Sequence, residues 1–321
     1  MKVLITGISG QDGIFLVNKL LESHNDIKIY GTSRNYNEKI FLDNLGSVSK
    51  IKNFNNVLVH NINLLDSNLV ENMIDEIRPD LLFNLSGPSS VYESIINPNI
   101  KNEIVKIFDN LINAGIKSNN FFKFFQASSS EMFNQHINMK LNEKTDFNPI
   151  SPYAEGKLQV HQKIENIKQK YSWMINSGIM FNHESEFRQN DYLFMKIIKT
   201  AKDIKKNKKN NLTVGSLDLV RDWSFAGDFA EAIHLICLDG NGENYVIGSG
   251  VGKSINDLVQ VVFQYFNLDP NEFIKVDSTN LRIGDPLEIV SDPSKIKEKL
   301  NWETELGFED LILRCINKVS F

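Results

Sequence analysis

The feature that most constrains the fold is a glycine-rich turn between a short apolar run and an amphipathic helix. Residues 2–6 (KVLIT) read as a buried strand, and Gly7-Ile8-Ser9-Gly10-Gln11-Asp12-Gly13 follows at once. From about Ile14 onward, apolar residues recur at helical spacing. Such a strand–turn–helix unit is typical of dinucleotide binding, because glycines permit a tight turn and let a pyrophosphate approach the helix N-terminus. The residues expected to contact the dinucleotide are Gly7, Gly10, Gln11, Asp12, Gly13 and Ile14.

Further apolar runs extend this unit into a Rossmann-type, doubly wound α/β fold. Strands are expected at 27–32, 57–62, 81–85 and 122–127, and helices at 67–77, 104–114, 228–238 and 255–266. Strands that alternate with helices predict a parallel sheet covered on both faces, with ligands beyond the carboxyl ends of the strands. We expect the dinucleotide-binding domain at 1–175, with a returning segment near 212–240, and a smaller, partly interleaved substrate lobe at 176–321.

Composition argues against several other classes of protein. The chain of 321 residues has a net charge of -5 and only one short basic run, at 205–209, so no nucleic-acid role is expected. It lacks an apolar stretch of about 18 residues, and its first strand begins at residue 2, so neither a membrane span nor a signal peptide is expected. Cys237 and Cys315 lie in apolar, helix-like surroundings without metal-ligand spacing. We expect reduced core cysteines, no metal site and a cytoplasmic protein.

The end of the second strand bears on which dinucleotide is bound. An acidic residue there would bond the adenosine ribose and exclude a 2′-phosphate. This chain has Gly31-Thr32-Ser33-Arg34 instead. A guanidinium can pair with the phosphate, so NADP is favoured. NAD remains the alternative if Arg34 is only a surface cation.

A Tyr-x-x-x-Lys pattern, Tyr153 to Lys157, suggests a catalytic pair. On a helix these positions share one face, and a nearby cation is expected to lower the pKa of the phenol and favour its use as a base. In residues 126–133 (QASSSEMF), after the last predicted strand of this half, Ser129 can supply a hydroxyl to the same substrate oxygen. The alternative is that these serines cap the next helix. The specific signal is the full combination of Ser129, Tyr153 and Lys157.

Together these motifs resemble the GDP-mannose 4,6-dehydratases, which belong to the extended short-chain dehydrogenase/reductases. The resemblance runs in order along nearly the whole chain, through residues 5–13, 126–133, 151–157, 181–185 (FNHES), 221–223 (RDW) and 292–295 (DPSK). It implies that Tyr153, Lys157 and Ser129 oxidise C4 of a GDP-hexose, GDP-mannose being the first choice. Glu131 would then remove the C5 proton and protonate the departing C6 oxygen, and hydride would return to C6. Glu131 could instead be an ordinary first-turn carboxylate.

The same matching implies further binding residues. For the cofactor they are Arg34, Asn63, Leu64, Leu85, Ser86, Gly87, Ser89, Tyr153, Lys157, His183 and Arg188. For the nucleotide diphosphate sugar they are Ser89, Ser130, Asn182, Lys196, Arg221 and Arg282. Two arginines suit a diphosphate, because each forms paired charge-assisted bonds, although either could be a surface cation.

Departures from the family's pattern cluster at the substrate and assembly regions. Asn63 replaces an aspartate, and residues 186–189 read EFRQ where the family has PRRG. Arg34 is followed by asparagine rather than a second arginine, and residues 282–285 read RIGD in place of RPTE. The sugar and the base therefore stay open. In the family the loop after the second strand, which carries the paired arginines, helps build a tetramer. Because this chain keeps only Arg34 there, we expect a homodimer, with a tetramer as the alternative.

Other functions also stay open. A nucleotide-uronic acid oxidative decarboxylase can carry a similar Ser-Glu pair, whereas a 4-epimerase or 4-keto reductase would not need Glu131. An inactive NADP-binding protein would need no catalytic residue.

Residues 248–254 (GSGVGKS) lack the first glycine of a Walker A loop, and Ser254 with Asp257 predicts a helix N-cap instead.

Overall fold

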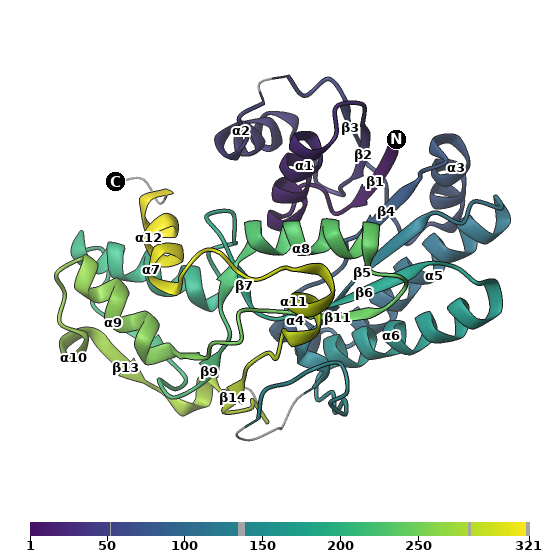
Figure 1. The fold of residues 1–321 in the computed structure, drawn as a ribbon. Helices are drawn as coiled ribbons and strands as arrows, with labels where there is room; N and C mark the ends of the chain where they lie inside the picture. Colours follow the sequence, from purple (N-terminus) through teal and green to yellow (C-terminus); the bar gives the residue numbers. More distant parts are fainter. Residues whose placement is uncertain (52, 134–138, 282–283, 319–321) are drawn as a thin grey trace.

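The computed structural model describes residues 1–51, 53–133, 139–281 and 284–318, and at its centre lies a seven-stranded sheet. The strand order is β11-β6-β5-β4-β1-β2-β3, and every neighbouring pair is parallel (Figure 1). The strands are β1 (Lys2–Thr6), β2 (Lys28–Thr32), β3 (Val57–His60), β4 (Leu81–Asn84), β5 (Lys123–Ser129), β6 (Ile175–Met180) and β11 (Asn244–Ile247). The predicted doubly wound α/β fold is confirmed.

Helices cover both faces of the sheet. One face carries α1 (Gln11–Ser23), α2 (Glu38–Val48) and α8 (Ala226–Asp239), and the other carries α3 (Ser67–Ile77), α5 (Ile100–Lys117) and α6 (Pro152–Tyr171). Strand β1 shows why its sequence is continuously apolar: Val3 and Ile5 lie in the first core and Leu4 in the second. Successive side chains of a strand point to opposite faces, so a strand covered on both faces needs apolar residues throughout.

Element boundaries differ from the predicted ones where hydrogen bonding rather than apolar pattern sets them. Helix α1 begins at Gln11, before the predicted start at Ile14, because Gly10 is its N-cap. Strand β5 extends past the apolar run to Ser129, because Ser128 and Ser129 pair with Ile179 and Met180 of β6. Periodicity marks a buried face, whereas the ladder of backbone bonds decides where an element ends.

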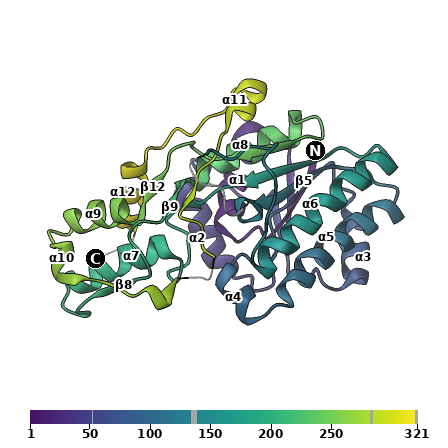
Figure 2. The same cartoon turned by 90° about the horizontal axis from the view of Figure 1, so that it is seen from below.

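The smaller lobe has its own apolar core, built from α7 (Leu193–Lys205), α9 (Ile255–Tyr265) and α12 (Phe308–Lys318). Figures 1 and 2 show it beside the lobe that holds the large sheet. It contains a pair of strands, β8 (Leu212–Val214) with β13 (Ile274–Val276). Three-stranded and two-stranded sheets join the lobes: β9 (Val220–Arg221) with β12 (Lys253–Ser254) and β14 (Glu288–Ile289), and β7 (His183–Glu184) with β10 (Ser224–Phe225). The short elements are α4 (Val91–Ile96), η1 (Ser130–Met132), α10 (Pro270–Phe273), η2 (Ser278–Asn280) and α11 (Ser294–Leu300).

The chain crosses between the lobes more than once. After β6 it enters the smaller lobe, and it returns to the large sheet as α8 and β11, over residues 226–247. Strand β8, which lies within the predicted returning stretch near 212–240, packs Leu212 and Val214 into the core of the smaller lobe instead. The chain therefore passes from the sheet-bearing lobe into the smaller lobe and back.

Smaller sequence features are also visible. Cys237 and Cys315 are free and buried. Ser254 accepts a hydrogen bond from the N–H of Asp257, whose side chain accepts one from the N–H of Ser254, so the predicted N-cap is confirmed as a capping box. Among the helices of the described ranges, none combines the length and the apolar character that a bilayer crossing requires.

Candidate active site

A cavity of about 840 Å³ lies beyond the carboxyl ends of β4 and β5, with walls from both lobes. The large sheet contributes residues after β4 and at the end of β5, and the smaller lobe contributes the start of α7, residues around β8 and β9, and part of 280–285. The position agrees with the rule that ligands of parallel sheets bind beyond the carboxyl ends of the strands.

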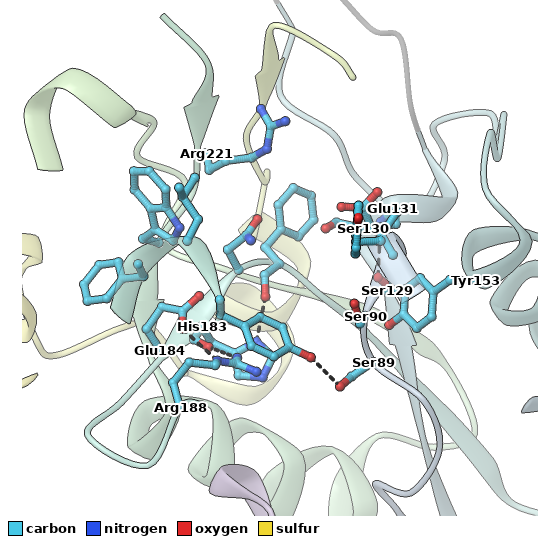
Figure 3. A pocket seen from close by; sticks show the side chains of 18 of the residues that line it. Ser89, Ser90, Ser129, Ser130, Glu131, Tyr153, His183, Glu184, Arg188 and Arg221 are labelled. Carbon is cyan, nitrogen blue, oxygen red and sulfur yellow. Dashed lines mark hydrogen bonds and ion pairs between the residues drawn. The ribbon is translucent and has the colours of Figure 1, made fainter. Parts of the chain in front are cut away.

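The four predicted catalytic side chains all line this cavity. Ser129 ends β5, Glu131 lies in η1, and Tyr153 and Lys157 lie one turn apart on α6. Ser151 accepts a hydrogen bond from the N–H of Ala154 and so fixes where α6 begins. Figure 3 shows Ser129, Glu131 and Tyr153 on the same side of the cavity. The fold thus brings together a hydroxyl, a carboxyl, a phenol and an ammonium from three elements.

The predicted effect of Lys157 on Tyr153 is wrong for this structure. Burial is the largest influence and raises the pKa of the Tyr153 phenol; Glu131 and Tyr192 act in the same direction, while Ser129 and Arg188 lower the pKa. Lys157 directs its Nζ to the carbonyl of Ala127, at 2.8 Å, and lies 5.7 Å from the centre of the Tyr153 ring. Burial also lowers the pKa of Lys157 to about 8. The unfavourable free energy of burying a phenolate at this position therefore outweighs any electrostatic stabilisation by the neighbouring ammonium.

The capping role that was the alternative for the serines after β5 is confirmed, and the role of Ser129 at a substrate oxygen stays a prediction. The Oγ of Ser129 accepts a hydrogen bond from the N–H of Glu131, at 3.2 Å, and so caps η1 as the alternative predicted. Ser129 also lowers the pKa of the Tyr153 phenol, against the effect of burial, and Ser130 is buried in the cavity wall. Capping by Ser129 therefore directs residues 130–132 so that Glu131 faces the cavity.

The glycine turn after β1 forms a cradle without side chains. Gly7 has a φ of +75°, and a Cβ there would lie 2.9 Å from the carbonyl oxygen of Leu85. A Cβ at Gly13 would lie only 2.3 Å from the oxygen of Ile8. Within the described residues no side chain caps α1 at Gly10, so its first N–H groups remain for a ligand. The geometry suits a pyrophosphate.

Gln11 and Asp12 tie this turn to β7. The side chain of Gln11 donates to the carbonyl of His183, at 2.9 Å, and accepts from Ser185, at 2.9 Å. The Nε2 of His183 lies 3.1 Å from the Asp12 carboxylate. Burial favours a raised pKa for Asp12, but His183 and then Arg188 outweigh it and lower the pKa below its ordinary value. Asp12 and His183 line the cavity, and their role in cofactor binding stays a prediction.

Arg188 also lines the cavity, but much of its charge is satisfied within the protein. Its Nε donates to Glu184 at 2.7 Å, and its terminal nitrogen donates to the carbonyl of His183. The Glu184 side chain is almost fully buried, which makes this a strong and shielded pair. The other face of the guanidinium packs 4.7 Å from the ring centre of Tyr192.

Ser89 and Ser130, two of the predicted substrate residues, lie in the sheet-bearing lobe, and the others described lie toward the smaller lobe. Asn182, Lys196 and Arg221 line the cavity, and Figure 3 shows Arg221 across it from Tyr153. Arg221 pairs with Asp285 at 2.8 Å and donates to the carbonyl of Pro286 at 3.0 Å. Arg282 lies outside the described residues.

The remaining predicted cofactor residues divide into two groups. Leu85, Ser86, Gly87 and Ser89 line the cavity. Gly7, Gly10, Gln11, Gly13, Ile14, Arg34, Asn63 and Leu64 do not line it and follow β1, β2 and β3 along the same edge of the sheet. Arg34 is exposed next to Ser33, whose Oγ lies 2.7 Å from that of Ser9. The side chain of Asn63 accepts from the N–H of Leu65, at 3.1 Å, and so closes its own loop.

Three polar residues that the sequence did not single out contact predicted site residues. Glu184 pairs with Arg188, Tyr192 bonds Ser89, and Asp285 pairs with Arg221. Only the first could have been suspected, because opposite charges lie four residues apart. The other partners are 103 and 64 residues apart in the chain, so no local pattern connects them.

Comparisons with known proteins agree along the whole chain. The family model described as GDP-mannose 4,6 dehydratase matches residues 4–315. GDP-mannose 4,6 dehydratase 2 of Arabidopsis thaliana is 31% identical over 98% of this chain and 86% of its own length. The human GDP-mannose 4,6 dehydratase is 28% identical over 98% of this chain and 90% of its own length.

Solved structures show the same fold at lower identity. The UDP-glucose 4-epimerase of Thermotoga maritima, solved with UDP-glucose, has a TM-score of 0.84 and 22% identity and covers 99% of this chain and 98% of its own. A dTDP-glucose 4,6-dehydratase of Streptomyces venezuelae, solved with NAD, has a TM-score of 0.85 and 19% identity, with 99% and 96% covered.

Proposed function

Because this chain belongs to the GDP-mannose 4,6-dehydratase family, we propose that it is an NADP-dependent lyase acting on a GDP-hexose, with GDP-mannose the first candidate. The product would be the GDP-linked 4-keto-6-deoxy sugar. The observation that carries the proposal is that Glu131 and Tyr153 line one cavity, with Ser129 beside both. A 4-epimerase or 4-keto reductase would have no use for that carboxyl group.

The glycine cradle at Gly7, Gly10 and Gly13 fits the pyrophosphate of a nicotinamide dinucleotide, because a Cβ at Gly7 or Gly13 would meet backbone. The absence of an acidic residue at the end of β2, with Ser33 and Arg34 there instead, supports NADP; NAD is the alternative. When bound, the cofactor supplies the acceptor for hydride from C4 and the donor of hydride to C6. Asp12 and His183 would hold it between the turn and β7.

Tyr153 would take the proton of the C4 hydroxyl while Ser129 hydrogen-bonds the same oxygen. Burial raises the pKa of the phenol, so the phenolate that accepts this proton must be stabilised by positive charge, from Lys157 and from the nicotinamide ring of the oxidised cofactor. The phenol O–H can then donate to the new C4 ketone and polarise it, which acidifies the C5 hydrogen. The ammonium of Lys157, held at the carbonyl of Ala127, adds positive potential to this region.

Glu131 would act on the other side of the reacting carbons. Its carboxylate takes the C5 proton, a double bond forms between C5 and C6, and the C6–O bond breaks. The departing oxygen takes the proton from Glu131 and leaves as water. Ser130, the neighbouring residue in the cavity wall, is not an acid, so one carboxyl group performs both transfers. Hydride then adds to C6 and C5 takes a proton from solvent, while Tyr153 releases the proton that it took from the C4 hydroxyl, so the cofactor and both residues return to their starting states.

A panel of nucleotide sugars labelled with deuterium at C4 tests this proposal. We expect GDP-mannose to lose one water and to carry the label at C6, with no net formation of NADPH. Failure of every GDP-, dTDP-, UDP- and CDP-hexose to give a 4-keto product would refute it. Release of carbon dioxide from a nucleotide-linked uronic acid would instead support the decarboxylase.

The assembly and location follow as lesser proposals. We propose a cytoplasmic homodimer, with a tetramer as the alternative. Light scattering across a range of protein concentrations, with and without NADP, distinguishes the two assemblies.

A further inference from the structure

Two hydroxyl groups from different lobes meet across the cavity. Ser89 follows β4 in the sheet-bearing lobe, and Tyr192 immediately precedes α7 in the smaller lobe. Their side-chain oxygens lie 2.7 Å apart, the bond drawn as a dashed line at Ser89 in Figure 3. Both residues line the cavity that holds Tyr153 and Glu131. The pair therefore faces the same space as the proposed catalytic groups.

The phenol of Tyr192 is held in place rather than left to rotate. The guanidinium of Arg188 packs on its ring, 4.7 Å from the centre, and Arg188 is itself held by the buried carboxylate of Glu184. A cation on the face of an aromatic ring restrains its orientation, and a tyrosine has few side-chain torsions to lose. The hydroxyl is thus presented to the cavity at low entropic cost.

The position and chemistry of the pair suit a sugar hydroxyl. Figure 3 shows Ser89 on the same side of the cavity as Tyr153, and Tyr192 is hydrogen-bonded to Ser89. Serine and tyrosine hydroxyls each donate and accept one or more hydrogen bonds, and neither is charged at neutral pH. The cations expected at the diphosphate are other side chains of the same cavity, Lys196 and Arg221. A neutral hydroxyl beside C4 is therefore a better match than a phosphate.

We infer that Tyr192 and Ser89 together bind a secondary hydroxyl of the hexose, at the ring positions near C4, and that Tyr192 is a specificity-determining residue. This assignment rests on the proposed dehydratase function. The substrate hydroxyl accepts from one protein hydroxyl and donates to the other, replacing the direct bond between them.

Tyr192→Phe tests the assignment, because it removes the hydroxyl and keeps the ring under Arg188. We expect KM for the nucleotide sugar to rise about 3- to 10-fold, the size expected for one lost hydrogen bond, and kcat to change less. The dissociation constant of NADP should not change. Ser89→Ala should raise KM similarly, and the double variant should show less than the product of the two effects, because both hydroxyls bind one group. Tyr265→Phe, on α9 outside the cavity, is the matched control.

Deoxy substrates identify the hydroxyl. GDP-hexoses that lack the C2 or the C3 hydroxyl are compared with the parent sugar in wild type and Tyr192→Phe. For one of the two analogues, the wild type should bind more weakly and the substitution should have no further effect. An unchanged KM in Tyr192→Phe, or a substitution effect that both analogues retain in full, overturns the assignment.

The failures of the two proposals can be told apart. If Tyr192→Phe binds NADP more weakly and the nucleotide sugar equally well, the hydroxyl pair lies at the cofactor. That result overturns this inference and leaves the proposed function standing. A wild type that turns over no GDP-hexose overturns the proposed function. Calorimetric binding of GDP-mannose to the same variants then decides the inference, since equal affinities would refute it.

Discussion

Replacing Glu131 with glutamine separates the two halves of the proposed reaction. The substitution keeps the size of the side chain and removes its negative charge and its ability to exchange a proton. The backbone should hold, because the N–H of residue 131 still donates to Ser129 and the neighbouring Met132 is fully buried. Oxidation at C4 depends on Tyr153 and should proceed, whereas elimination of water should stop.

The size of the effect follows from the role of one carboxyl group. A positioned general acid or base contributes about 10²- to 10⁴-fold, which corresponds to about 3–5 kcal/mol in the activation free energy. The two transfers by Glu131 are consecutive steps, so the slower one sets the rate and the factors do not multiply. We therefore expect kcat to fall by about 10²- to 10⁴-fold, with little change in substrate binding.

The assay is the absorbance of reduced nicotinamide after enzyme, NADP and nucleotide sugar are mixed. Glu131→Gln should accumulate reduced cofactor up to about one equivalent of enzyme, because the 4-keto intermediate cannot lose water. Tyr153→Phe should form none. Glu93→Gln, an exposed carboxyl residue at the rim of the cavity, is the matched control and should behave as wild type. Turnover within about threefold of wild type, or a loss of turnover without reduced cofactor, would contradict the role of Glu131.

Three further predictions concern the framework around the site. Burial lowers the pKa of His234 to about 4, so between pH 6.5 and pH 4 the unfolded chain binds more protons than the folded chain. The contribution of His234 to the free energy of unfolding should therefore be fully present above pH 6.5 and be lost as the pH falls to 4. The expected loss is about 2 kcal/mol after allowance for solvent screening. Thermal melting against pH should show this slope, and His234→Phe should reduce it to the part due to His161, whose pKa burial also lowers. Asp222 is fully buried and accepts hydrogen bonds from the backbone N–H groups of Ser249, Gly250 and Ser291, so Asp222→Asn should cost about 3 kcal/mol in urea unfolding, and an unchanged midpoint would contradict this. Gly13→Ala should weaken NADP binding at least about tenfold in a fluorescence titration, because its Cβ would lie 2.3 Å from the oxygen of Ile8; retained affinity would show that the turn is not the pyrophosphate site.

Local sequence predicted the parts of the site whose members are close in the chain. The cradle from Gly7 to Gly13, the pair Tyr153 and Lys157, and the serines before Glu131 each depend on spacings that a strand, a turn or a helix fixes by itself. The order of those elements also predicted the parallel sheet and the edge at which the cavity lies.

The sign of the pKa shift on Tyr153 could not be predicted in this way. Helical spacing correctly placed Lys157 near the phenol, but burial, which sets the direction, arises from segments packed around α6. Spacing reports which groups are neighbours, whereas desolvation depends on everything else that surrounds them.

By itself, then, the sequence determined the α/β fold, the dinucleotide turn and which residue types could carry the chemistry, because hydrogen bonding along the chain and the alternation of side chains are local properties. Only the tertiary structure decided which groups from distant parts of the chain meet: Ser89 with Tyr192, Arg221 with Asp285, and Asp12 with His183. Those partners lie on different segments, and their distances depend on how these segments pack in three dimensions, for which no residue spacing carries a signal.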